Sequence, residues 1–459
     1  MNEHTTTPCL LFPELASKPV VVAFDQEHAS SDGGAVLLKA ADDRLSLTAT
    51  LAACLRDDRQ AGKITHELRD LIAQRIFGLA CGYADANDAA RLANDPIHKL
   101  LLGRNPIDGD ALASQPTLCR FENSVGPLTS YRLGSALADL VIERHRRRLG
   151  GKARRITVDL DPTDDPTHGG QQLSLFNGYY DTWCYLPILG FLTFDDEPEE
   201  HLFTAVLRPG NAPARLGAIA ILRRILDRLR EAFPGARFLV RLDGGFACPE
   251  VLDFLDEQPG LNYIVAIAEN AVLKRRSAKL MRKARKRSRK TGKTANLFGD
   301  CRYAARKRWP HKRRVVIKAE VVRLEGRTPR DNARYVVTNL RCSPQRVYAT
   351  YRDRGDVENR IKELHHGLEI DRTSCTRFWA NQFRVLMTAA AYVLMQEIRL
   401  AAKRTASARA QVSTLRERLI KLGAHVVVSV RRIVLHLPAS FPFMDEWNRV
   451  ARVLGAQTG

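Results

Sequence analysis

The strongest limit on the fold comes from one short run, residues 155–165. Its sequence, RITVDLDPTDD, alternates aliphatic and polar residues and then ends in carboxylates. A period of two predicts a strand with Thr157, Asp159 and Asp161 on one face, and Pro162 stops the strand just after the last of these acids. Carboxylates crowded at a strand end repel one another unless a cation lies among them. The run therefore indicates either a cation site or a turn that uses Asp and Pro for their backbone geometry.

The following elements have the order of an α/β sheet. Apolar runs predict strands at 184–192, 202–207, 237–243 and 263–267, and amphipathic patterns predict helices at 218–233 and 249–256. If the run at 155–165 supplies the first strand, the strand at 237–243 is the fourth, and it ends in Asp243. If these two strands are neighbours in one sheet, Asp161 and Asp243 project from the same edge, where a divalent metal ion can hold them together.

A third acid lies on a predicted helix at 351–366. Tyr351, Arg354, Glu358, Lys362 and His365 recur at spacings of three and four, which places them on one helical face. Taken alone, such a face is equally typical of a solvated helix with ion pairs. Three carboxylates from separate elements match what two magnesium ions need for displacement at phosphate, which favours a catalytic face.

The charge of the chain indicates a polyanionic partner. The formal net charge is +21, and nucleic acid is the simplest partner for it. Residues 274–293 hold twelve Lys and Arg and no acid, which predicts an exposed, mobile segment suited to a phosphate backbone. A membrane surface is the alternative partner, but no apolar stretch is long enough to span a bilayer. Nothing at the N-terminus resembles a secretion signal, and the nine cysteines are scattered singly, so we expect a cytoplasmic protein.

Two further segments are candidates for DNA contact. Residues 110–123 predict a helix, a tight break and a second helix with Pro116 at its start, the outline of a helix-turn-helix. Its residues Ser114, Gln115, Thr117 and Arg120 would face a groove, although short helix pairs are also common without DNA. Trp309 precedes a predicted β-rich stretch, and a lone Trp is more often part of a core than a residue that stacks on a ligand.

Together these motifs resemble a DDE transposase with a ribonuclease H-like core, specifically the bacterial insertion-sequence family thirteen-eighty. The resemblance covers most of the chain and rests on residues 159–169 with 176–178, on 241–246, on the spacing Tyr351-x-x-Arg354-x-x-x-Glu358, and on 114–123.

The resemblance implies a role for each site residue. Asp161, Asp243 and Glu358 would hold two Mg²⁺ or Mn²⁺ ions. Asp159 is the alternative first ligand, and Asp161 is preferred because the family pattern places this ligand two residues before a Thr, here Thr163. Tyr351 and Arg354 would position phosphate. Related transposases carry a Lys seven residues after the Glu; His365 stands there, and Lys362 is its candidate substitute. Trp309 would stack on a flipped base.

The implied protein is a transposase. It would bind the terminal inverted repeats of its mobile element in double-stranded DNA, cleave the strands and join the 3′ ends to target DNA, as a homodimer in the synaptic complex at the bacterial nucleoid. Two other functions stay open: a sequence-specific DNA-binding regulator without catalysis, and a metal-dependent nuclease that never joins DNA.

The expected fold is multi-domain α/β. A mainly helical DNA-binding domain (1–150) precedes the first part of a ribonuclease H-like, mixed-sheet catalytic core (151–270). A basic, β-rich insertion (271–345), the core helix that carries Glu358 (346–400) and a C-terminal region (401–459) follow.

Overall fold

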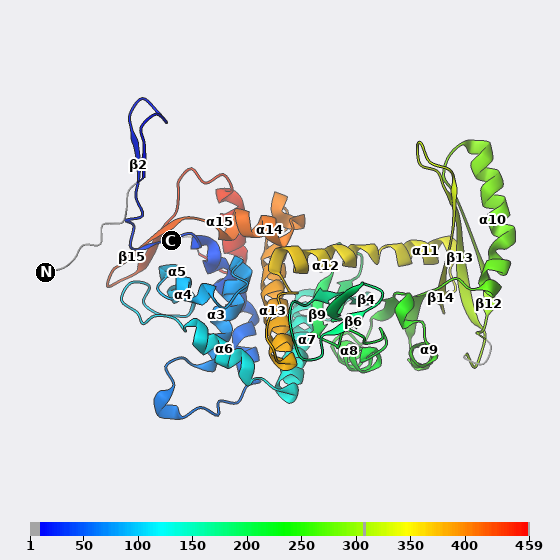
Figure 1. The fold of residues 1–459 in the computed structure, drawn as a ribbon, viewed down its shortest axis with the longest axis horizontal. Helices are drawn as coiled ribbons and strands as arrows, with labels where there is room; N and C mark the ends of the chain where they lie inside the picture. Colours follow the sequence, from blue (N-terminus) through cyan, green and yellow to red (C-terminus); the bar gives the residue numbers. More distant parts are fainter. Residues whose placement is uncertain (1–9, 306–308, 458–459) are drawn as a thin grey trace.

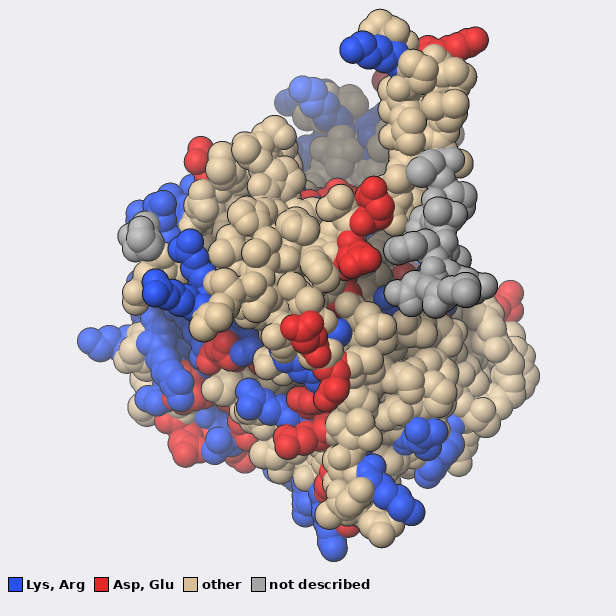
Figure 2. Space-filling model, turned by 90° about the vertical axis from the view of Figure 1, so that its left-hand side faces the viewer, with Lys and Arg blue, Asp and Glu red and all other residues tan. Residues whose placement is uncertain are grey.

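The computed structural model describes residues 10–305 and 309–457. Figure 1 shows an elongated molecule, with the N-terminal helices and the C-terminal segment at one end, a sheet in the middle, and long strands beside helix α10 at the other end. Figure 2 views the first of these ends, where Lys and Arg are interspersed with Asp and Glu and separated by broad uncharged areas.

The centre of the molecule is a mixed sheet of eight strands, as expected for a ribonuclease H-like core. The strand order is β12-β13-β14-β11-β10-β4-β8-β9. The strands are β4 (Arg155–Pro162), β8 (Ile188–Phe194), β9 (His201–Val206), β10 (Arg237–Leu242), β11 (Leu261–Ile267), β12 (Ala295–Tyr303), β13 (Arg313–Val322) and β14 (Arg330–Thr338). β4 and β10 are parallel neighbours, with Asp159 opposite Arg241. The condition stated above for Asp161 and Asp243 to share one edge, that their two strands are neighbours, is therefore met.

The predicted strand at 184–192 is two strands, β7 (Thr182–Tyr185) and β8. Pro187 lies between them and has no N–H to donate to a ladder. β7 instead joins β5 (Asp165–Pro166) and β6 (Leu175–Asn177) in a separate small sheet.

Helices α10 (Ala271–Thr291) and α11 (Pro344–Arg352) cover opposite faces of the insertion strands. Val316 and Val336 pack with Val347 and Tyr348 of α11. Ala319 and Val321 pack with Met281 and Ala284 of α10. Since side chains alternate between the faces of a strand, the two helices lie on opposite sides of the same sheet.

The basic block is a helix and not the mobile segment that its charge predicts. Leu273, Ser277, Met281, Ala284 and Ser288 are buried at spacings of three and four, while every Lys and Arg of α10 is exposed. Lys and Arg are good helix formers, and one weakly apolar stripe is enough to seat the helix on the sheet.

The first helix of the predicted helix-turn-helix is absent: residues 110–114 belong to neither a helix nor a strand. The Gln74 side chain donates to the carbonyl of Ala113 and accepts from its N–H, which holds this segment open. The second helix is confirmed as α6 (Gln115–Ser124), with Pro116 in its first turn.

The helices at the two ends of the chain share one hydrophobic core. Helix α13 (Phe378–Ala401) is buried along almost its whole length and packs against N-terminal helices, β9 and the C-terminal helix α15. The other helices are α1 (Val36–Leu45), α2 (Leu47–Ala52), α3 (Leu68–Cys81), α4 (Asp88–Leu92), α5 (Pro96–Leu101), α7 (Pro127–Leu149), α8 (Ala218–Ala232), α9 (Pro249–Glu257), α12 (Gly355–Leu368), α14 (Val412–Leu415) and α15 (Met444–Val453). None of the helices in the described part of the chain combines the length and apolar character needed to cross a membrane.

Candidate active site

Asp161 lies at the end of β4 and is buried beside an arginine. Its side-chain Oδ1 is 2.7 Å from Nη2 of Arg354, the residue before α12. Burial raises the pKa of Asp161 to about 7, with Arg354 opposing the shift and the charges of Asp243 and Glu358 adding to it. Asp243 and Glu358 therefore both lie close enough to Asp161 to act on it electrostatically.

Asp243 directly follows β10, the parallel neighbour of β4. It is partly exposed, and its Oδ1 accepts a hydrogen bond of 3.0 Å from the N–H of Gly245 at the start of a short 3₁₀ turn. The parallel pairing thus brings Asp161 and Asp243 to the same edge of the sheet, as the alternation predicts.

Glu358 is exposed in the first turn of α12. Two contacts hold this helix along the end of β4: Arg354 at Asp161, and His365 Nε2 at 3.1 Å from Thr163 Oγ1. Residues 354, 358 and 365 share one helical face, so Glu358 points to the same side. Among the residues that the structure describes, these three acids do not bring their carboxylate oxygens together within 4.8 Å.

Asp159 differs from Asp161 in its contacts. Arg241 donates to both of its carboxylate oxygens, from Nε at 2.8 Å and Nη2 at 2.7 Å. Arg241 also donates from Nη1 to the carbonyl of Thr350 in α11. The charge of Asp159 is therefore neutralised inside the protein, and its role in the structure is to join β4, β10 and α11.

The remaining residues of the predicted helical face do not lie on one helix. Helix α11 ends at Arg352 and α12 begins at Gly355, so Tyr351 belongs to α11. Burial raises the pKa of Tyr351 to about 12, which keeps its hydroxyl protonated beside Arg354. His365 is held by Thr163 and by Asp371, whose Oδ2 lies 2.9 Å from Nδ1, while Lys362 is exposed.

A groove of about 500 Å³ opens beside Glu358 and extends onto the insertion strands. Aromatic and basic side chains from three strands and two helices line it, among them Phe298, Lys318, Arg334, Tyr348, Tyr351, Arg352 and Arg354. Sequence reasoning missed the three strand residues of this set. Only the alternation of side chains along the strands could have identified them in the sequence. Lys318 and Arg334 face the same side of the sheet as Val316 and Val336.

Trp309 does not line this groove. It packs edge-on against Tyr303, with ring centres 5.3 Å apart, and under the guanidinium of Arg313. Arg313 pairs with Asp253 and Asp256 of α9, on the face that α10 covers. These contacts agree with the core interpretation of Trp309 and give no support to base stacking.

Of the predicted DNA-contacting residues, Gln115, Thr117 and Arg120 lie on α6 and Ser114 directly precedes it. Figure 1 shows α6 among the N-terminal helices, apart from β4 and α12. Leu118 and Phe121 are buried, and Phe121 contacts Phe383 of α13 edge-on. Ser114 and Arg120 are exposed, and Gln115 and Thr117 are partly exposed. Solvent can therefore reach this face of α6, but the structure does not test whether DNA binds it.

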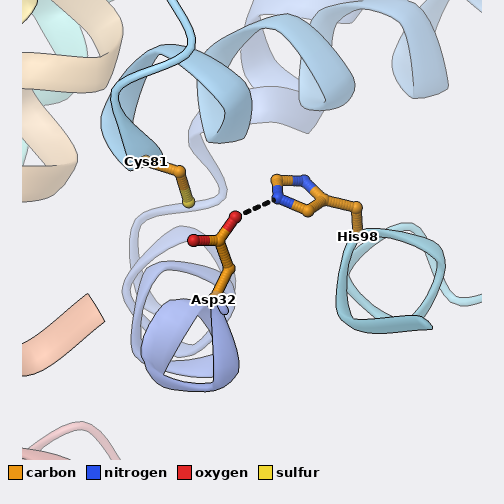
Figure 3. Close-up of side chains that lie close together, drawn as sticks. All are labelled: Asp32, Cys81 and His98. Carbon is orange, nitrogen blue, oxygen red and sulfur yellow. Dashed lines mark hydrogen bonds and ion pairs between the residues drawn. The ribbon is translucent and has the colours of Figure 1, made fainter. Parts of the chain in front are cut away.

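Another group has metal-ligand chemistry. Asp32, Cys81 and His98 are buried together, with His98 Nε2 at 2.9 Å from Asp32 Oδ2 (Figure 3). Lys421 Nζ lies 2.7 Å from the other oxygen of Asp32, and burial raises the pKa of the Cys81 thiol. Because Lys421 already supplies the positive charge and the thiol stays protonated, this group fits an internal ion network better than a metal site.

A comparison with protein families identifies the chain. It matches the family model described as Transposase DDE domain group 1 over residues 12–458. No curated protein matches it. The chain therefore belongs to the DDE transposases, a family of DNA-binding, DNA-processing enzymes that normally use divalent metal ions.

Proposed function

We propose that this DDE transposase binds the terminal inverted repeats of its mobile element, cleaves the strands and joins the 3′ ends to target DNA by two-metal phosphoryl transfer. We further propose that it belongs to insertion-sequence family thirteen-eighty and acts as a homodimer in the synaptic complex. The observation that supports the chemistry most directly is the convergence of Asp161, Asp243 and the Arg354–Glu358 turn at one edge of the sheet.

The site suits hard divalent cations such as Mg²⁺ or Mn²⁺. Carboxylate oxygens are the ligands such ions prefer, and the raised pKa of Asp161 means that Arg354 alone does not offset the burial of this carboxylate. Asp161, Asp243 and Glu358 would hold the ions. Bound there, the ions would stabilise the charge that develops on the attacking and leaving oxygens.

The residues around the acids would orient the DNA. Nε of Arg354 is buried without a hydrogen-bond partner among the described residues, so it can donate to a phosphate oxygen. The protonated hydroxyl of Tyr351 is a second donor, and Lys362 adds an exposed charge one turn beyond Glu358. Phe298 and Tyr348 of the groove are better placed than Trp309 to stack on a base near the cut.

Single-acid variants test this proposal. Asp161→Ala, Asp243→Ala and Glu358→Ala should each abolish cleavage and joining of terminal-repeat DNA in Mg²⁺ while DNA binding persists, because each removes stabilisation needed only in the transition state. Gel analysis of cleaved and joined strands provides the readout. Ca²⁺ should support binding without turnover.

Asp159→Asn is the matched control on the same strand. It removes the partner of Arg241, so we expect a lower melting temperature but residual Mg²⁺-dependent cleavage. Wild-type cleavage by all three alanine variants would refute the assignment of these acids, and repeat binding by the wild type without any cleavage would favour a regulator without catalysis. Cleavage by the wild type without any joined product would favour a nuclease.

A further inference from the structure

We propose that α10 is a second DNA-binding surface, which takes a duplex separate from the strand cut at Asp161, Asp243 and Glu358. The inference rests on the proposed function, because it assigns a partner to a part of the transposase that the chemistry does not use. Its evidence is the charge pattern of α10, the lack of compensating acids and the position of the helix.

The charges of α10 form a stripe directly opposite its buried side. Arg275, Lys279, Arg282, Lys286 and Arg289 follow spacings of four, three, four and three, and all five are exposed. The buried positions, from Leu273 to Ser288, occupy the other side of the helix. At about 1.5 Å per residue the stripe is about 21 Å long, close to six base-pair steps of 3.4 Å.

Within residues 10–305 and 309–457, none of these five side chains has an ion-pair partner. Two other basic residues of α10 do: Lys274 lies 3.9 Å from Glu269, and Arg285 pairs with Asp331. Like charges at a spacing of four destabilise a helix. An uncompensated stripe that remains helical is therefore a preformed surface for a polyanion, and duplex DNA is the polyanion on which the proposed function acts.

The position of α10 separates it from the DNA end that is cut. The groove beside Glu358 lies on the α11 side of the insertion strands, and α10 covers the other side. Figure 1 shows α10 at the extreme end of the molecule, outside these strands. The sheet would therefore lie between α10 and a straight duplex bound in the groove. The duplex on α10 is the target DNA, because contacts to phosphates are independent of sequence and the proposed terminal-repeat binding depends on sequence.

The opposite end of the molecule has a different charge pattern. On the face that Figure 2 shows, basic side chains are mixed with acidic ones and broad uncharged areas. Some exposed arginines outside α10 are ion-paired, such as Arg146 and Arg147 with Glu143. Contacts made by such a stripe go to phosphates, so binding at α10 should be independent of sequence.

The test replaces all five stripe residues by glutamine in the full-length protein: Arg275→Gln, Lys279→Gln, Arg282→Gln, Lys286→Gln and Arg289→Gln. Glutamine matches Lys and Arg in helix propensity, so α10 should persist. The control removes the same charge from exposed, ion-paired arginines: Arg56→Gln, Arg146→Gln, Arg147→Gln, Arg155→Gln and Arg228→Gln.

For a random-sequence duplex, the slope of log K against log salt should be shallower by about 4 in the stripe variant than in the control, since each phosphate contact contributes about 0.9. Cleavage of a short single-end duplex should match the control. Because α10 is proposed to hold target DNA, formation of the paired-end complex should persist, and joining of pre-cut ends should fall at least tenfold.

Three outcomes would overturn the inference. In the first, the salt slope equals that of the control. In the second, the slope falls but both pairing and joining are unchanged, so that no second duplex is involved. In the third, single-end cleavage falls in parallel with binding, which would place the cut DNA itself on α10. A wild-type protein that neither cleaves nor joins would refute the proposed function instead, while the salt slopes could still be measured.

Discussion

Three aspartates near the end of β4 differ in how far the surrounding residues compensate a negative charge on their carboxylates. Asp159 is neutralised by Arg241, and Asp161 is only partly offset by Arg354. Asp165 lies in β5, fully buried, and both of its oxygens accept from the Thr373 hydroxyl, at 2.9 and 3.0 Å. Burial raises the pKa of Asp165 to about 8. It is therefore a neutral hydrogen-bonding group near pH 7.

Asp165 should make the folded protein less stable as the pH rises. The folded state keeps a proton that the unfolded chain loses above its ordinary pKa of 3.8, so stability falls between about pH 4 and about pH 8 and then levels off. Denaturant unfolding at pH 5.5, 7 and 8.5 checks this. Asp165→Asn should remove that part of the pH dependence, because its amide cannot ionise. An equal slope in both proteins would contradict the assignment.

Helix α12 is positioned by a buried ion network on the side away from Asp161. Glu363 accepts from Arg360 at 2.9 Å, from the Tyr392 hydroxyl at 2.7 Å and from the N–H of Val412 at 3.1 Å. Arg399 of α13 donates to the same carboxylate. The network fixes the helix that carries Glu358 onto α13, so the geometry of the site depends on residues remote from it.

Glu363→Gln should therefore destabilise the protein by about 1–3 kcal/mol, because it removes a buried counter-charge that Arg360 and Arg399 share and leaves them only Glu200 and Glu199. Glu143→Gln is the control: Glu143 also pairs with two arginines but at the surface, where the loss should be about 0–1 kcal/mol. Urea unfolding of both variants provides the comparison. Equal losses would show that the buried network does not anchor α12.

The two ends of the chain are held together as one unit. β3 (Ala29–Ser30) pairs with β15 (Ala424–Val428), which is also paired with β16 (Ile433–His436). Lys421 reaches the buried Asp32 and lies 4.0 Å above the ring of Tyr83. The N-terminal helices therefore depend on the C-terminal segment for part of their core and for a counter-charge.

Lys421→Met should lower the free energy of unfolding by about 3–5 kcal/mol, because Asp32 would remain buried without its ammonium partner. Adding Asp32→Asn should recover part of the loss, since the double variant no longer buries an unpaired charge. Thermal unfolding of the single and double variants checks the prediction. A double variant less stable than Lys421→Met would contradict it.

Local periodicity accounts for much of what could be predicted. Alternation at β4 and β10 placed Asp161 and Asp243 at strand ends, and the rule for parallel neighbours brought them to one edge. A spacing of three and four placed Arg354, Glu358 and His365 on one side of a helix. These features depend on residues close together in the chain, so a repeat along the sequence reveals them.

Contacts between distant segments decided the rest. The Gln74 side chain binds both backbone groups of Ala113, and residues 110–114 are not helical although their composition favours a helix. Phe298, Lys318 and Arg334 become groove neighbours only through the pairing of β12, β13 and β14. Arg241 pairs with both oxygens of Asp159 and not with Asp161, the proposed metal ligand, a difference that their shared strand face could not show. A repeat along the chain determines the direction in which a side chain points, but only the packed fold determines which residues it contacts.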